Sequence, residues 1–183
     1  LIYGARVLGH PREYFCPFQV ALYGPELCGF ARVRNADELH RYIDAVAAKF
    51  GSHGRFGIKA HLHQLRQALE LGYDFEGRFP DRFVHITRAD VIGQAISHER
   101  AMQTGAWTAQ HKEAGRTEFA PEKIRATVHG FAAENQAWES LFRNYDVEPY
   151  RLSYEALCAD FEGELAQLLE YLEVDVRTVD VPA

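Results

Sequence analysis

The sequence predicts an α/β fold in which a layered parallel sheet is flanked by helices, within a single domain over residues 1–183. Three short apolar segments typical of strands alternate with stretches of helical periodicity, and such alternation favours parallel strands joined by helices. The length of 183 residues suits one domain. The content of 47% hydrophobic and 25% charged residues is typical of a globular protein, which argues against disorder.

The first part of the chain predicts a coil followed by a helix. Residues 8–29 contain three prolines and several aromatic residues, which indicates an ordered coil. Residues 36–50 repeat apolar side chains at helical spacing. Asn35 suits the N-cap of this helix and Gly51 its end.

The middle of the chain predicts two strands, each followed by a helix. Residues 55–59 form a short strand candidate, and a helix over residues 62–71 ends before Gly72. Residues 82–87 predict a buried strand that leads directly into a helix over residues 90–102. We place the following residues on the apolar side of that helix: Val91, Ile92, Ala95, Ile96 and Met102.

The last third predicts a polar loop, a long helix, a strand and a final helix. The loop covers residues 108–119, and Pro121 suits the first turn of the long helix. Residues 147–152 form the strand candidate, and residues 154–172 form the final helix.

Composition and charge exclude several classes of protein. A formal net charge of −6 argues against a general nucleic-acid binder, since such proteins carry a basic face. No apolar run approaches the roughly 20 residues that a membrane-spanning helix needs. The three cysteines form no CxxC pair, and their odd number argues against a disulfide framework, so we expect a cytoplasmic, reducing environment. His61 and His63 alternate, but no HExxH motif or Cys/His cluster supports a metal site.

One strand-to-helix connection has the residues of an anion site. Arg88 follows the strand over residues 82–87, and the next helix begins near Asp90. Free N–H groups at a helix N-terminus and a planar guanidinium suit a phosphate, and Ser97 would add a hydroxyl about two turns along the helix. On residue types alone, Arg88 in a structural ion pair is an equal alternative.

Six segments in order resemble the bacterial sulfotransferase family typified by trehalose 2-sulfotransferase. Residues 83–97, FVHITRADVIGQAIS, are similar to the strand and helix that bind the 3′-phosphate of the donor nucleotide. The other matches are Gly9–Phe15, Gly57–Lys59, Ala101–Trp107, the aromatic pair Trp138 and Phe142, and Tyr154–Leu157. Together they span residues 8–172.

The resemblance implies transfer of a sulfuryl group from 3′-phosphoadenosine 5′-phosphosulfate to a carbohydrate hydroxyl, without a metal. It implies that Glu13 is the general base, that Arg88 and Ser97 bind the 3′-phosphate, and that Trp107 stacks on a sugar or base. Partial burial beside rigid and aromatic neighbours would raise the pKa of Glu13. The alternatives are a solvated Glu13 and a Trp107 packed in the core. For Tyr154 and Glu155 we favour a structural role in fixing the last helix.

The family's phosphosulfate-binding loop, of the type Arg-x-Gly-Ser/Thr-Thr, has no match in the chain. The resemblance therefore predicts a P-loop-like sulfotransferase fold whose first strand, loop and helix lie upstream of Leu1. The alternative function is a noncatalytic binding or assembly module that kept the fold and lost the loop. The apolar stripe of the long helix, together with dimers among similar sulfotransferases, predicts a homodimer.

Overall fold

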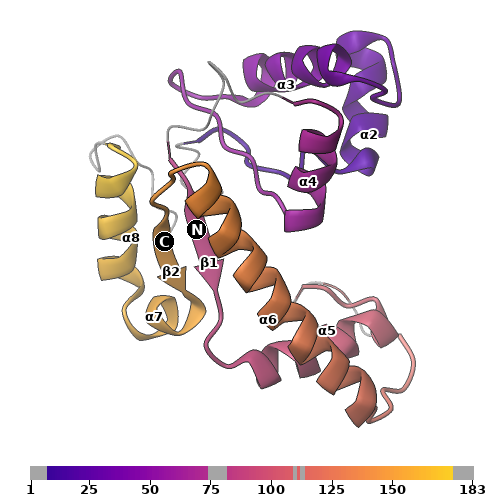
Figure 1. Ribbon diagram of the computed structural model, residues 1–183, viewed down its shortest axis with the longest axis vertical. Coiled ribbons are helices and arrows are strands. Elements are labelled where there is room, and N and C mark those ends of the chain that lie inside the picture. Colours follow the sequence, from indigo (N-terminus) through magenta and orange to yellow (C-terminus); the bar gives the residue numbers. More distant parts are fainter. Residues whose placement is uncertain (1–7, 74–81, 109–110, 112–113, 175–183) are drawn as a thin grey trace. The chain divides into compact units, whose positions relative to one another are not determined.

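The computed structural model describes residues 8–73, 82–108, 111 and 114–174 (Figure 1). The chain divides into two compact units, the first formed by residues 1–81 with 165–183 and the second by residues 82–164. The prediction of one domain over residues 1–183 stays a prediction.

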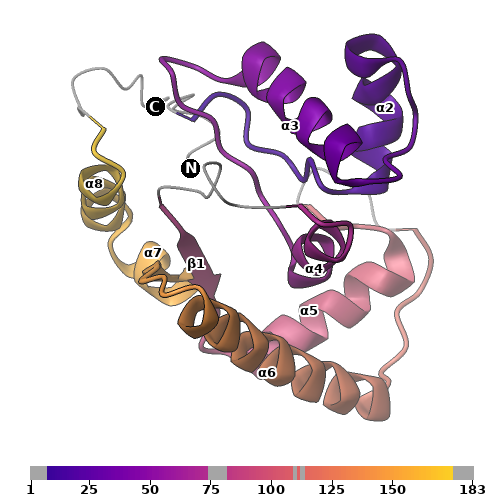
Figure 2. The same ribbon diagram turned by 45° about the horizontal axis from the view of Figure 1, so that its top comes forward.

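The first unit contains helices α2 (Pro17–Cys28), α3 (Ala36–Phe50) and α4 (Leu62–Glu70). Helices α2 and α3 pack against each other, as Figure 2 shows. Among the described residues, its core consists of side chains from these helices, together with one residue before α2 and one after α4: Tyr14, Val20, Leu39, Tyr42, Ile43, Val46, Ala68 and Tyr73.

Helix α2 corrects the prediction of a coil over residues 8–29. Pro17 occupies the first turn, where a missing N–H costs no hydrogen bond. Pro25 lies near the end of the helix, so it removes only one late hydrogen bond. Gly29 then ends the helix in the left-handed region, with its N–H donating to the Gly24 carbonyl. Both prolines occupy positions that a helix tolerates, so their presence did not indicate a coil.

Helix α3 confirms the prediction for residues 36–50. The Asn35 side chain accepts a hydrogen bond of 2.9 Å from the N–H of Glu38, and Gly51 follows the last turn. Helix α4 likewise matches the prediction within one residue. The strand predicted over residues 55–59 is wrong, since Ile58 forms only an isolated parallel bridge with Arg12.

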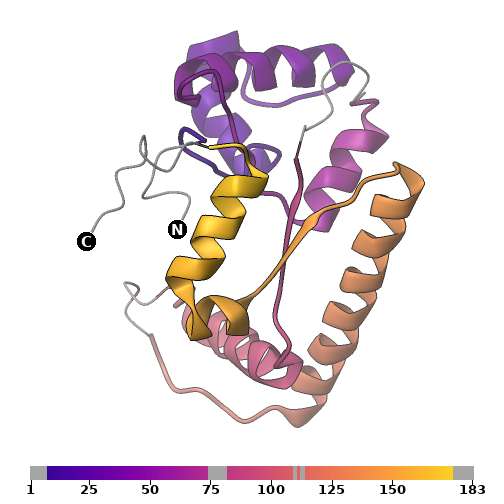
Figure 3. The same ribbon diagram turned by 90° about the vertical axis from the view of Figure 1, so that its left-hand side faces the viewer.

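The second unit contains a parallel pair of strands, β1 (Val84–Thr87) and β2 (Tyr150–Ser153), with His85 opposite Arg151. Figure 3 shows the two strands side by side. Helices α5 (Val91–Thr104) and α6 (Pro121–Asn144) pack against each other, and the short α7 (Tyr154–Ala159) follows β2. The α/β class and the parallel pairing are confirmed, and α6 begins at Pro121 as predicted.

The helix predicted over residues 154–172 is divided into α7 and α8 (Phe161–Tyr171). Asp160 separates them, with an extended φ of −147°. Its side chain accepts a hydrogen bond of 2.9 Å from the N–H of Gly163, which caps the start of α8. An aspartate that caps a new helix explains a break that apolar periodicity did not show.

The burial expected for β1 and α5 is partly wrong. His85 in β1 is buried, whereas Ile86 is 61% exposed. In α5, the small side chains Ala95 and Ala101 are buried, while three residues placed on the apolar side are exposed: Ile92, Ile96 and Met102. Helix α5 packs against α6, and its buried face carries small side chains while the large ones reach solvent. Within the described ranges, no helix combines the length and apolar character needed to cross a bilayer.

The first prediction concerns two glycines with positive φ. At Gly9 (φ +69°) a Cβ would lie 1.8 Å from the Phe50 carbonyl oxygen, whereas at Gly29 (φ +78°) no atom lies within 4 Å. Gly29→Ala should therefore cost only the left-handed strain, about 1 kcal/mol. Gly9→Ala must also displace backbone and should cost about 3 kcal/mol or more. Urea unfolding of both variants measures the difference, and equal losses would contradict the contact at Gly9.

Candidate functional site

The backbone around Glu13 is fixed by contacts that do not involve its carboxylate. Tyr14 is fully buried, and its hydroxyl donates to the His10 carbonyl at 2.7 Å. The N–H of Lys59 donates to the Arg12 carbonyl at 3.0 Å. This pairing brings Lys59 next to Glu13 although the two residues are far apart in the sequence.

Three side chains contact the Glu13 carboxylate. Lys59 Nζ lies 2.8 Å from Oε1, and Gln64 Nε2 donates to Oε2 at 2.9 Å. His61 Nε2 lies 3.4 Å from Oε1. The Glu13 side chain is 29% exposed, so it is partly buried and still open to solvent.

The pKa of Glu13 is lowered. Burial of the carboxyl raises its pKa, but the hydrogen bonds from Lys59 and Gln64 and the charges of Lys59 and His61 together outweigh burial. The expected rise in the pKa of Glu13 is therefore wrong, because its partners are donors and a cation. The carboxyl is ionised at neutral pH and able to accept a proton.

The structure brings together two of the segments that carry the resemblance. The N–H of Gly57 donates to the Leu8 carbonyl at 3.1 Å, and a Cβ at Gly57 would lie within 3.2 Å of Leu8 and Pro11. Residues 9–15 and 57–59 thus lie side by side.

Sequence reasoning missed two partners of Glu13, His61 and Gln64. The available signal was their spacing at the start of α4, where a Gln at the third helical position can accept from the N–H of the N-cap residue. The structure shows this bond, from the N–H of His61 to Gln64 Oε1 at 3.0 Å.

Arg88 lies at the end of β1 against residues of α7. Its guanidinium carbon lies 4.8 Å from the centre of the Tyr154 ring, and its Nε lies 4.0 Å from Glu155 Oε1. That Nε is buried and has no hydrogen-bond partner within the part of the chain that is described. Arg88 therefore has both the structural contact and an unused donor.

Glu155 occupies the N–H groups of the turn that follows β1. Its carboxylate accepts from the N–H of Ala89 at 2.9 Å and from that of Asp90 at 3.1 Å. The N–H of Gly93 donates to the Asp90 side chain, which caps α5. The expectation of free N–H groups is wrong at these three positions. The structural role favoured for Glu155 is confirmed, since it joins α7 to the β1–α5 turn.

Ser97 and Trp107 both reach the surface of the second unit. Ser97 is an exposed residue of α5, and Trp107 follows the end of that helix. Trp107 is 54% exposed, so the alternative in which it packs in the core is wrong. Its ring lies 5.6 Å from that of His98 in an edge-on arrangement, and the backbone N–H of Trp107 donates to His111 Nδ1 at 3.2 Å. An exposed, supported indole has a free surface for stacking.

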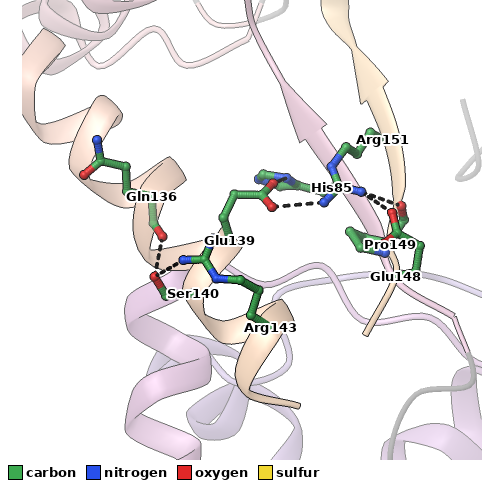
Figure 4. Close-up of polar contacts among 8 residues, drawn as sticks. All are labelled: His85, Gln136, Glu139, Ser140, Arg143, Glu148, Pro149 and Arg151. Atoms are coloured by element: carbon green, nitrogen blue, oxygen red, sulfur yellow. Dashed lines mark hydrogen bonds and ion pairs between the residues drawn. The ribbon is translucent and has the colours of Figure 1, made fainter. Parts of the chain in front are cut away.

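A second polar cluster joins α6 to both strands (Figure 4). Glu139 of α6 lies between His85 and Arg151, with its Oε1 3.5 Å from His85 Nδ1 and its Oε2 2.9 Å from the Arg151 guanidinium. Burial lowers the pKa of His85, and Glu139 only partly offsets this effect. The His85 ring also packs edge-on against Phe142, which stacks with Trp138. Trp138 and Phe142, the aromatic pair that carries part of the resemblance, therefore pack against His85 of β1.

The candidate residues belong to different units of the chain. Glu13 and its partners lie in the first unit, while Arg88, Ser97 and Trp107 lie in the second. Each group therefore has its own set of supporting contacts.

A sequence profile of the Stf0 sulphotransferase family matches residues 64–183. The chain belongs to this family. The matched region contains Arg88, Ser97 and Trp107, whereas Glu13 and Lys59 precede it.

Two curated relatives are similar to about half of the chain. The trehalose 2-sulfotransferase of Mycolicibacterium smegmatis is 30% identical over 101 residues, which cover 54% of this chain and 38% of the relative. That of Mycobacterium tuberculosis strain Erdman is 27% identical over 103 residues, which cover 55% of this chain and 38% of the relative. The matched part of the chain thus spans about two fifths of each relative's length.

The second prediction tests the role of Glu155 through pH. Backbone hydrogen bonds lower its pKa in the folded protein, so the stability that the ionised group contributes is present at neutral pH and is lost as the pH falls below about 4. Glu155→Gln should therefore destabilise the protein at pH 7 but little at pH 3. Urea unfolding at both pH values measures this change, with Glu170→Gln, an exposed substitution on α8, as the control. A difference from the wild type that is equal at both pH values would contradict the assignment.

Proposed function

We propose that the protein transfers a sulfuryl group from 3′-phosphoadenosine 5′-phosphosulfate to a hydroxyl of a sugar. Membership of the Stf0 sulphotransferase family supports the reaction class, and the names of the two relatives support a carbohydrate acceptor. The single observation that carries the proposal is the Glu13 carboxylate, which is ionised, partly exposed and held by Lys59 and Gln64.

Glu13 supplies the general base in this proposal. A sugar hydroxyl is a weak nucleophile until its proton is removed as it attacks, so a carboxylate in a fixed orientation accelerates the step. The hydroxyl oxygen forms a bond to sulfur while the bond from sulfur to the phosphate oxygen of the donor breaks, and the proton moves to Glu13. A lowered pKa lets the carboxyl release that proton to water before the next turnover.

Arg88 supplies the main contact to the 3′-phosphate of the donor. The Arg88 side chain is 31% exposed, so part of it can reach a ligand, and the stacking of the guanidinium on Tyr154 fixes its plane. Ser97 adds a hydroxyl from α5, and the exposed Trp107 ring stacks on a sugar or base. The homodimer predicted from the long helix stays a prediction.

The third prediction tests Glu13 as the base. Glu13→Gln keeps the size of the side chain but removes its ability to accept a proton, so turnover should fall about 10²–10⁴-fold. Glu26→Gln provides a matched control, because Glu26 is also a glutamate paired with a lysine, in this case Lys49. The control should stay within about twofold of the wild type. Transfer from sulfur-labelled donor measures both, and near-normal turnover in Glu13→Gln would contradict the proposal.

The fourth prediction tests Arg88. Arg88→Ala should weaken binding of adenosine 3′,5′-bisphosphate by about 2–4 kcal/mol, since it removes a charge-assisted contact. Binding of adenosine 5′-phosphate, which lacks the 3′-phosphate, should change little. Calorimetric titration compares the two nucleotides, with Arg125→Ala on the exposed face of α6 as the control. Equal losses for both nucleotides would show that Arg88 has a structural role only.

A further inference from the structure

Gln64 is a buried polar side chain whose amide has two assigned partners. It is 3% exposed and lies in the first turn of α4. Its Oε1 accepts from the N–H of His61 at 3.0 Å, and its Nε2 donates to Glu13 Oε2 at 2.9 Å. Because the acceptor end is fixed by a backbone N–H, the amide can present only its NH₂ group to Glu13.

The contacts on Glu13 divide unequally between its two carboxylate oxygens. Oε1 faces Lys59 Nζ at 2.8 Å and His61 Nε2 at 3.4 Å, whereas Oε2 has Gln64 alone among the described residues. Each carboxylate oxygen offers about two acceptor positions. Each oxygen thus accepts one hydrogen bond and keeps an acceptor position, and Oε2, whose donor is a neutral amide and not the lysine cation, is the more basic of the two.

We propose that Gln64 is a positioning residue that orients Glu13 so that the carboxylate takes the proton of the acceptor hydroxyl at Oε2. The inference rests on the proposed function. As the hydroxyl oxygen bonds to sulfur, its proton moves to Oε2 and the electron pair of the broken sulfur–oxygen bond leaves with the donor's phosphate. The proton then passes to water, since Glu13 is partly exposed. An amide suits this position because it donates to the carboxylate at every pH without changing its own charge.

The fifth prediction concerns the loss of this orientation. Gln64→Leu removes the donor to Oε2. It places an apolar side chain of similar size in the buried position. A displacement of about 1 Å at a reacting group can cost about a hundredfold in rate, so kcat should fall about 10- to 100-fold. KM should stay within about threefold, because the contact acts on the transition state. Gln67→Leu, an exposed substitution on the same helix, provides the control and should leave both constants unchanged.

A second variant gives a signature that a merely structural role would not produce. Gln64→Glu introduces a carboxyl of nearly the same shape, which can donate to Glu13 only when it is protonated. Glu13 and the introduced carboxyl then lie next to each other and ionise in two steps. After the first step one proton remains on the pair, so the introduced carboxyl can still donate to an ionised Glu13. After the second step neither carboxyl can donate, and the orienting hydrogen bond is lost. The wild-type rate should rise with pH to a plateau, whereas the Gln64→Glu rate should be highest at acidic pH and fall as pH rises. Gln67→Glu should keep the wild-type profile.

The outcomes separate this inference from the proposed function. Near-normal turnover in Glu13→Gln, or no sulfuryl transfer by the full-length wild type, overturns the function and the inference together. If Glu13→Gln is inactive while folded Gln64→Leu turns over like the wild type, the inference alone is overturned. A Gln64→Glu profile that matches the wild type overturns it as well. If Gln64→Leu does not fold, the nearly isosteric Gln64→Glu still decides the question through its pH profile.

Discussion

The connection from β1 to α5 depends on one ionised carboxylate. A chain that leaves a strand and enters a helix exposes backbone N–H groups that need acceptors. Glu155 supplies two of them, for Ala89 and Asp90, and the Asp90 side chain supplies a third for Gly93. Since Glu155 belongs to α7, directly after β2, the same bonds join the ends of both strands. The position of Arg88, between these residues and Tyr154, follows from this arrangement.

Glu13 differs from Glu155 in what its contacts do for the fold. Glu155 satisfies backbone groups, so its charge is needed to hold the chain path. The chain around Glu13 is already held by the Tyr14 hydroxyl and by the backbone bond between Lys59 and Arg12. The partners of the Glu13 carboxylate are side chains, and one of them, Gln64, is buried. The buried amide also accepts from the N–H of His61 at the start of α4, so one side chain both caps that helix and holds the carboxylate that we propose as the base.

Features that depend on neighbouring residues could be predicted from the sequence. Contacts between residues far apart in the sequence could not. The cap at Asn35 and the apolar stripe of α3 lie within one segment, so both could be predicted. The lowered pKa of Glu13 could not, because Lys59 and Gln64 are 46 and 51 residues away. The exposure of Ile86 depends on what packs against each face of β1. The resemblance placed Arg88 correctly at the end of its strand but gave no indication that Glu155 would occupy the neighbouring N–H groups.

The proposed base and the proposed phosphate-binding arginine belong to different units of the chain. The partners of Glu13 lie at residues 59–64, whereas Tyr154 and Glu155, which contact Arg88, lie after β2. Substitutions in the two groups act on separate sets of contacts, and such effects are expected to add. In the proposed reaction, proton transfer at Glu13 governs the rate, while Arg88 governs affinity for the nucleotide. A double variant of Glu13 and Arg88 should therefore combine the rate loss of one with the affinity loss of the other, and a strong departure from additivity would mean that one group supports the other.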